Sequence, residues 1–152
     1  MRLEGKVAVV SGALGGMGRV ACERFSAEGA AVVGIDLVSH GAEAFAAGLR
    51  ERGRDFEFHT ADVGSESDIL ALAAQVEQSR GTVDILYNNA GVNLGRPLLD
   101  TTLDEWERLL RINVTSVFLM TKAFAPLMRS GRGSIVNVSS VAAVVAFPDA
   151  AA

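Results

Sequence analysis

The sequence has little cysteine, little excess charge and no long apolar run. Cys22 is the single cysteine among 152 residues, so no disulfide forms within the chain, which is typical of a reducing compartment such as the cytoplasm. The 14 basic residues face 18 acidic ones, and the absence of a basic cluster argues against a nucleic-acid partner. The longest apolar stretch, residues 141–147, is too short to span a membrane, and charges at Arg2, Glu4 and Lys6 exclude a signal peptide. No metal-ligand spacing is present.

Aromatic residues are also scarce, at 6%, although 49% of the chain is hydrophobic, so Ala, Val and Leu supply most of the apolar content. This composition is typical of parallel strands covered by helices on both faces. Short apolar runs alternate with segments of helical periodicity. We expect strands at residues 7–10, 30–35, 56–59, 83–87 and 134–138, and helices at 17–25, 42–52, 65–78 and about 103–128.

This alternation predicts right-handed βαβ units and a parallel sheet. The fold class is therefore α/β, a Rossmann-type doubly wound sheet with strand order 3-2-1-4-5, in a single domain over residues 1–152. In such sheets the ligand crevice lies where the strand order reverses, here between the first and fourth strands.

A glycine-rich turn joins the first strand to the first helix. Gly12, Gly16 and Gly18, with Met17 between the last two, stand where the backbone bends sharply and approaches another group closely. The helix that follows presents free N–H groups, which favour an anion such as a pyrophosphate. The alternative is a plain structural turn. A P-loop is disfavoured because no Gly-Lys-Ser/Thr follows.

Asp36 ends the second strand, eighteen residues after Gly18. A carboxylate at this position accepts hydrogen bonds from both hydroxyls of an adenosine ribose and repels a 2′-phosphate. Neither Gly15 nor the adjacent Leu37 supplies a basic side chain for such a phosphate. The sequence therefore favours NAD over NADP, and the alternative is a solvated Asp at a strand end.

Two further strand ends carry candidate ligand contacts. Asp62 and Val63 follow the third strand, and Asn89, Ala90 and Gly91 follow the fourth. The small residues of the second group let a flat ring or a ribose lie close to the backbone. The alternative is that Asn89 and the preceding Asn88 hold the loop together through backbone hydrogen bonds.

Asn113 lies within an apolar stripe of the long predicted helix, where we expect side chains to face the core; the stripe is Trp106, Leu110, Asn113, Val117, Thr121 and Phe124. A buried amide without a partner costs about 1–3 kcal/mol, so a backbone group, a water or a catalytic group must satisfy it. A hydrogen-bonded core Asn is the alternative. Ser139 and Ser140 end the fifth strand, where they either cap a turn or bind a substrate oxygen.

Taken together, these motifs resemble the short-chain dehydrogenase/reductase family. Residues 11–18 are similar to its Thr-Gly-x-x-x-Gly-Ile-Gly turn, and residues 88–91 match its Asn-Asn-Ala-Gly motif. Asp62 resembles the family's adenine-binding Asp. Asn113 and Ser140 resemble its catalytic Asn and Ser.

The resemblance implies hydride transfer between a nicotinamide and a secondary alcohol or ketone, in a protein that forms homodimers or homotetramers. Counted from Ser140 with the family's spacing, the catalytic Tyr and Lys are expected just beyond Ala152. The single tyrosine, Tyr87, lies on the fourth strand and does not match. We therefore expect a sheet that is incomplete at its C-terminal side, an exposed fifth strand that favours aggregation, and little or no turnover by these 152 residues. The alternatives are a non-catalytic NAD-binding module and, less well matched, a methyltransferase-like domain.

Overall fold

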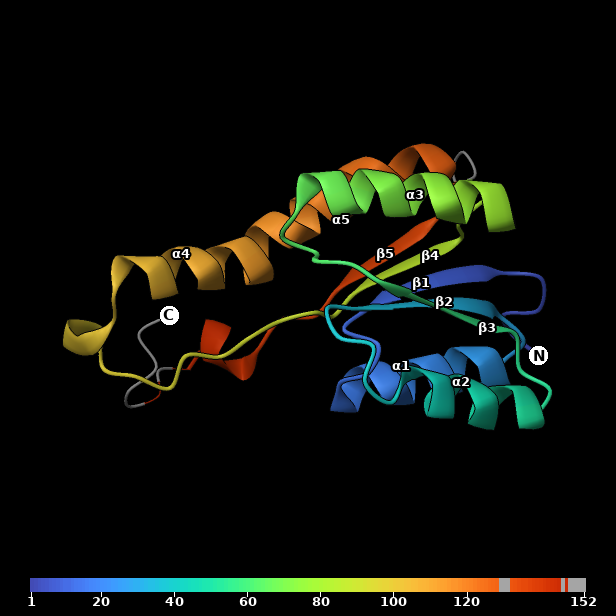
Figure 1. Cartoon of the computed structure of the whole chain (residues 1–152), viewed down its shortest axis with the longest axis horizontal. Coiled ribbons are helices and arrows are strands. Elements are labelled where there is room, and N and C mark those ends of the chain that lie inside the picture. Colours follow the sequence, from blue (N-terminus) through green and yellow to red (C-terminus); the bar gives the residue numbers. More distant parts are fainter. Residues whose placement is uncertain (129–131, 146, 148–152) are drawn as a thin grey trace.

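The computed structural model describes residues 1–128, 132–145 and 147, and within them the strands form one parallel sheet (Figure 1). The observed order, β3-β2-β1-β4-β5, confirms the predicted one. Each neighbouring pair is parallel, so the carboxyl ends of all these strands meet at one edge. The strands are β1 (Val7–Ser11), β2 (Ala31–Asp36), β3 (Phe56–Thr60), β4 (Ile85–Asn88) and β5 (Ser134–Asn137).

Helices cover both faces of the sheet (Figure 1). The helices α1 (Gly16–Ala27) and α2 (Ala42–Glu51) lie on one face, and α3 (Glu66–Arg80) and α5 (Ser116–Phe124) lie on the other. The remaining helix, α4 (Leu103–Leu110), extends past the carboxyl edge of the sheet. Burial on both faces explains why the strands read as continuous apolar runs.

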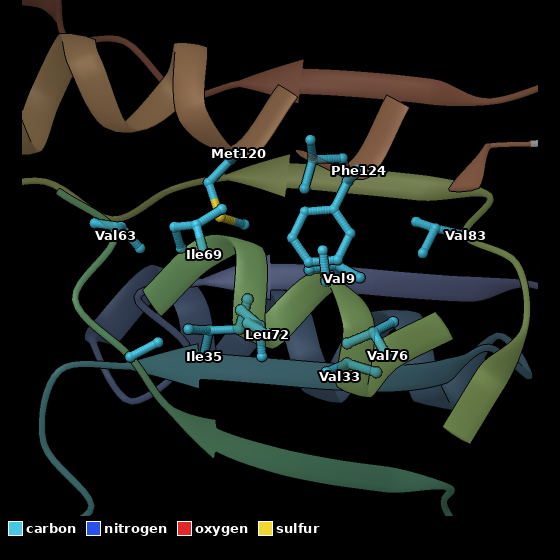
Figure 2. Close-up of a cluster of buried hydrophobic side chains, with 13 residues drawn as sticks. Val9, Val33, Ile35, Val63, Ile69, Leu72, Val76, Val83, Met120 and Phe124 are labelled. Carbon is cyan, nitrogen blue, oxygen red and sulfur yellow. The ribbon is translucent and has the colours of Figure 1, made fainter. Parts of the chain in front are cut away.

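The core beneath α3 and α5 joins residues that are distant in sequence. Figure 2 shows Met120 and Phe124 of α5 pointing toward the sheet, with Ile69 of α3 beside Met120. Val9 and Val33 supply the strand side of this cluster, and all five side chains are almost fully buried. The residues that alternate with them along β1 and β2, including Ala8, Val10 and Val32, point to the opposite core, beneath α1 and α2.

Cys22 belongs to that second core and is completely buried. Burial raises the pKa of the Cys22 thiol to about 12, because a thiolate at this position loses its hydration.

The long predicted helix over residues 103–128 is interrupted, and its predicted apolar stripe is partly wrong. A π-helical turn at Arg111–Thr115 separates α4 from α5. Because a π-helical turn holds an extra residue, one 3.6-residue period does not continue from α4 into α5. The buried faces of the two helices therefore do not form one stripe. Before the turn, Leu109 is 7% exposed, whereas the predicted Trp106 is 38% exposed.

After the turn the buried face is also shifted from the predicted one. Ser116, Leu119 and Met120 are buried, whereas Val117 and Thr121 are half-buried. Leu110, which the prediction placed on the stripe, is exposed, and only Phe124 is fully buried as expected.

Strand β5 forms an open edge within the described residues, since it pairs with β4 alone. All of its residues are exposed, including the apolar Ile135 and Val136. This agrees with the expected exposure of the fifth strand.

The glycine turn packs directly against the first helix. Gly12 has a φ of 66°, in the left-handed region that favours glycine. A Cβ at Gly18 would lie 1.9 Å from the Gly12 carbonyl oxygen, so only glycine allows this approach. By contrast, a Cβ at Gly16 would meet nothing within 4 Å.

Replacing Gly18 with Ala is expected to destabilise the chain by about 3 kcal/mol, because backbone must move to admit the methyl group. Gly16→Ala is the matched control, and we expect its stability within about 1 kcal/mol of the wild type. Urea unfolding followed by circular dichroism measures both. Equal stabilities of the two variants would contradict the close packing of α1 on the turn.

The Cys22 thiol is expected to resist alkylation and disulfide exchange at pH 8, because it is both buried and protonated. Since the chain has a single cysteine, labelling with a chromogenic disulfide reports this site alone. Labelling should become complete in denaturant. Rapid stoichiometric labelling of the folded chain would show that the α1 face opens.

Candidate functional site

A cleft of about 560 Å³ opens at the carboxyl edge of the sheet, beside β1 and β4. Loops that follow β1, β2, β3 and β4 supply its walls, as predicted for the point where the strand order reverses. Nearly all the predicted cofactor-binding residues line it: Gly12, Gly16, Met17, Asp36, Leu37, Asp62, Val63, Asn89, Ala90 and Gly91. The exception, Gly18, packs beneath the turn.

Some lining residues were not predicted from the sequence; they are Leu14, Gly15, Val38, Ala61, Val92, Arg108 and Ile112. Most of them are neighbours of predicted residues and follow from the same loops. Arg108 and Ile112 come from the helical segment that extends past the sheet. Because they are four residues apart, both lie on one helix face. This spacing is the sequence signal that could have predicted them as a pair.

The amino end of α1 faces this cleft without a competing side chain. Gly15 precedes the helix and makes no side-chain cap, and no acidic residue occupies the first turn. Unpaired N–H groups at such a terminus, together with the helix dipole, favour a bound anion. This supports the predicted phosphate contact of the turn.

Asp36 is held in place by two backbone amides. The Leu14 N–H donates to its Oδ2 and the Leu37 N–H donates to its Oδ1, both at 2.9 Å. Each carboxylate oxygen keeps a further lone pair for a ligand hydroxyl. The glycine turn and the end of β2 are therefore joined through the residue expected to bind ribose.

Ser11 and Asn89 join the ends of β1 and β4. The Ser11 Oγ accepts hydrogen bonds from the Asn89 and Ala90 N–H groups, at 3.0 and 3.1 Å. The Asn89 Nδ2 donates to the carbonyl oxygens of Ser11 and Gly12, at 3.0 and 3.3 Å. The predicted alternative for this asparagine, a loop held together by backbone hydrogen bonds, is thus confirmed. The same bonds keep Ala90 beside the turn.

Asp62 links the end of β3 to the π-helical turn. Its Oδ2 accepts from Arg111 Nη1 at 2.9 Å, and its Oδ1 accepts from the Gly64 N–H at 2.8 Å. The Asp62 carboxylate in the cleft wall is therefore oriented by Arg111 and by the Gly64 amide.

The Asn113 side chain pairs with the backbone of Val92. Its Oδ1 accepts from the Val92 N–H and its Nδ2 donates to the Val92 carbonyl, both at 2.8 Å. The hydrogen-bond partner expected for this side chain is therefore the backbone of Val92, in a loop that lines the cleft. Asn113 itself is half-buried in the π-helical turn, a feature that is frequent at functional sites.

Ser140 lies outside the cleft lining. It is exposed just after β5, and its Oγ accepts from the Ala142 N–H at 3.1 Å, which caps the short turn Val141–Ala143. Nearby, Asn88 and Asn137 join the ends of β4 and β5 through a 2.9 Å amide hydrogen bond. The cap predicted as one alternative for Ser140 is thus present.

Among the residues that the structure describes, no group of His, Cys, Asp and Glu is arranged to hold a metal ion. In the same part of the chain, no helix has the length and apolar character needed to cross a bilayer.

Asn113→Asp is expected to destabilise the chain by about 1–3 kcal/mol at pH 7, because an ionised carboxylate faces the Val92 carbonyl and no longer donates to it. This contact raises the pKa of the introduced carboxyl in the folded state. The loss of unfolding free energy should therefore become smaller as the pH falls toward 4 and the carboxyl is protonated. Urea unfolding between pH 4 and 7 measures it. Asn113→Leu is the control, and an identical pH dependence of both variants would contradict the amide pairing.

Comparison with known proteins identifies relatives of this chain. Residues 6–152 match the family described as short chain dehydrogenase. D-threitol dehydrogenase from Mycolicibacterium smegmatis is 40% identical over 147 residues, which are 95% of this chain and 56% of that protein. Meso-2,3-butanediol dehydrogenase from Serratia marcescens is 37% identical over 93% of this chain and 55% of its own length. The chain thus spans little more than half the length of these relatives.

Solved structures share the fold. NAD⁺-bound xylitol dehydrogenase superposes with a TM-score of 0.93 at 34% identity, covering 99% of this chain and 59% of that one. A metagenomic short-chain oxidoreductase in complex with NADP has a TM-score of 0.93 at 35% identity, covering 99% of this chain and 69% of its own. The match to family, relatives and structures shows that the chain belongs to the short-chain dehydrogenase family.

Proposed function

We propose that this chain binds NAD(H) in the cleft at the carboxyl edge of the sheet and serves a hydride transfer between the nicotinamide and a secondary alcohol or ketone. The observation that carries the proposal is the continuity of the cleft, which runs from the glycine turn past Asp36 to the small residues Ala90 and Gly91. Membership of a dehydrogenase family supports the reaction class.

The residues present fit a dinucleotide. The amides at the start of α1, from Gly16 and Met17, suit the pyrophosphate, and a Cβ at Gly16 would meet only open space. Asp36 suits the adenosine ribose, while Leu37 and Val63 offer apolar surface to the adenine beside Asp62. Asn89, Ala90 and Gly91 form the wall we assign to the nicotinamide half.

We infer a preference for NAD over NADP from charge. The Asp36 carboxylate, ordered by two amides, repels a 2′-phosphate, and neither Gly15 nor Leu37 neutralises one. Xylitol dehydrogenase bound to NAD⁺ is among the similar structures, and so is an oxidoreductase bound to NADP. The preference therefore depends on the residues of this chain.

The bound nicotinamide supplies the hydride chemistry. We assign Ser140 to orient the substrate oxygen, and Asn113 to maintain the wall of the cleft at Val92 and to take part in a proton relay. Relatives named for D-threitol and meso-2,3-butanediol support a small secondary alcohol as substrate.

Proton transfer requires a further acid–base group. From the family resemblance we expect a Tyr assisted by a Lys. The single tyrosine, Tyr87, packs edge-on against Phe25 with ring centroids 5.7 Å apart, so we assign it to the core. We therefore propose little turnover by these 152 residues alone. A non-catalytic NAD-binding module, the second candidate, also binds cofactor without turnover.

We also propose a cytoplasmic homodimer or homotetramer. Val114 and Phe118 are each 61% exposed on the helical segment that carries Asn113, which supports contact with a second copy. The single buried thiol of Cys22 supports a reducing compartment.

The test is a titration of the chain with NADH and NADPH, with S-adenosylmethionine as the control ligand, followed by calorimetry. We expect NADH to bind more tightly than NADPH by at least about tenfold, because the 2′-phosphate meets the Asp36 carboxylate. In Asp36→Asn, the Kd for NADH should rise about tenfold or more, because charge-assisted hydrogen bonds to the ribose are lost. The ratio of the Kd for NADPH to the Kd for NADH should become smaller.

An unchanged preference in Asp36→Asn would contradict the assigned role of Asp36. Absence of binding by either dinucleotide would contradict the proposed function as a whole.

A further inference from the structure

Arg19, in the second turn of α1, makes contacts that the site described above does not use. Its Nε donates to the Leu14 carbonyl oxygen at 2.9 Å. Its guanidinium carbon lies 4.7 Å from the centre of the Phe45 ring of α2. The side chain is half-buried, and the ion pairs of the described residues do not include it. Arg24, one turn further along α1, instead pairs with Glu28.

The carbonyl that Arg19 holds belongs to a residue of the cleft wall. Leu14 donates its N–H to Asp36 Oδ2 at 2.9 Å, and its carbonyl accepts from Arg19. Both polar backbone groups of Leu14 are thus bound by side chains from two different elements. These two bonds fix the orientation of the peptide groups on both sides of Leu14, and hence of the turn that leads into α1.

The stacked ring prevents Arg19 from changing its position freely. Phe45 is buried in the core beneath α1 and α2, where its ring packs edge-on against Phe56 of β3 with centroids 5.3 Å apart. A guanidinium lying over this ring gains a cation–π attraction and loses rotational freedom. The donor that reaches Leu14 is therefore pre-oriented by the core.

We propose that Arg19 is a positioning residue for dinucleotide binding. By holding the Leu14 carbonyl, it keeps the turn in the shape that directs the Leu14 amide to Asp36. This inference rests on the proposed function. It assigns the effect to a single N–H donor at the Nε position rather than to the positive charge.

Three substitutions separate the donor from the charge. In Arg19→Gln, the Nε2 occupies the same place along the side chain as the arginine Nε, so a neutral donor remains. Arg19→Met has the same length as the Gln side chain but no hydrogen-bond donor. Arg19→Lys keeps the charge but places its nitrogen one atom further out.

The measurement is the Kd for NADH by calorimetry, with the thermal midpoint of each variant recorded alongside. We expect the Kd to rise about three- to tenfold in Arg19→Met and Arg19→Lys, the effect of one hydrogen bond, and by a clearly smaller factor in Arg19→Gln, which keeps the donor but loses the contact with Phe45. Arg24→Met is the matched control on the same helix, and its Kd should equal that of the wild type.

A double-mutant cycle distinguishes positioning from general destabilisation. Because Arg19 acts through Leu14 on Asp36, the effect of Arg19→Met on the Kd should be at least halved in the Asp36→Asn background. A merely structural role predicts the same effect in both backgrounds, and that result would overturn the inference.

Each remaining outcome also supports or overturns the inference. If Arg19→Lys binds like the wild type while Arg19→Gln is weakened, the charge acts and the inference is wrong. Equal Kd values across all variants overturn it as well, without touching the proposed function. If the wild-type chain does not bind NADH, the proposed function fails and this inference fails with it. Should Arg19→Met not fold, the comparison of Arg19→Gln with Arg19→Lys decides.

Discussion

The close approach of α1 to the glycine turn is the constraint on which the rest of the site depends. The Gly18 backbone lies against the Gly12 carbonyl at a separation that leaves no space for a Cβ. This contact lets the helix begin immediately above the carboxyl end of β1, so its free N–H groups face the cleft. A side chain at Gly18 would push the start of the helix away from the turn, and one at Gly12 would meet Ala90 and Asn89 after β4 at 3.0 Å.

Around that contact, polar groups from three strand ends are tied to a single turn. Ser11 and Asn89 exchange hydrogen bonds between β1 and β4, and Asp36 receives the Leu14 amide from the turn. Hydrogen bonds among loops of different strands restrict their relative motion before any ligand arrives. Part of the cleft wall thus consists of loop backbone that side chains hold in place before a ligand binds.

Sequence reasoning succeeded where spacing alone determines position. The strand order and most cleft residues were predictable, because parallel strands bring their carboxyl ends to one edge and the polar residues follow the strands directly. It failed along the long helix. The stripe through Trp106 and Leu110 assumed an unbroken 3.6-residue period, whereas the π-helical turn at Arg111–Thr115 shifts the buried face to Leu109. That turn coincides with the Asn113–Val92 pairing and the Asp62–Arg111 ion pair.

The sequence by itself determined the family, the α/β architecture and the loops that build the cleft, since these depend on the order and chemistry of residues along the chain. Only the tertiary structure decided what each polar side chain binds: Asn113 the Val92 backbone, Ser140 a turn amide, and Arg19 the Leu14 carbonyl. The physical reason is that such contacts depend on side-chain direction and on the local bend of a helix. Both are set by packing between elements that are far apart in sequence.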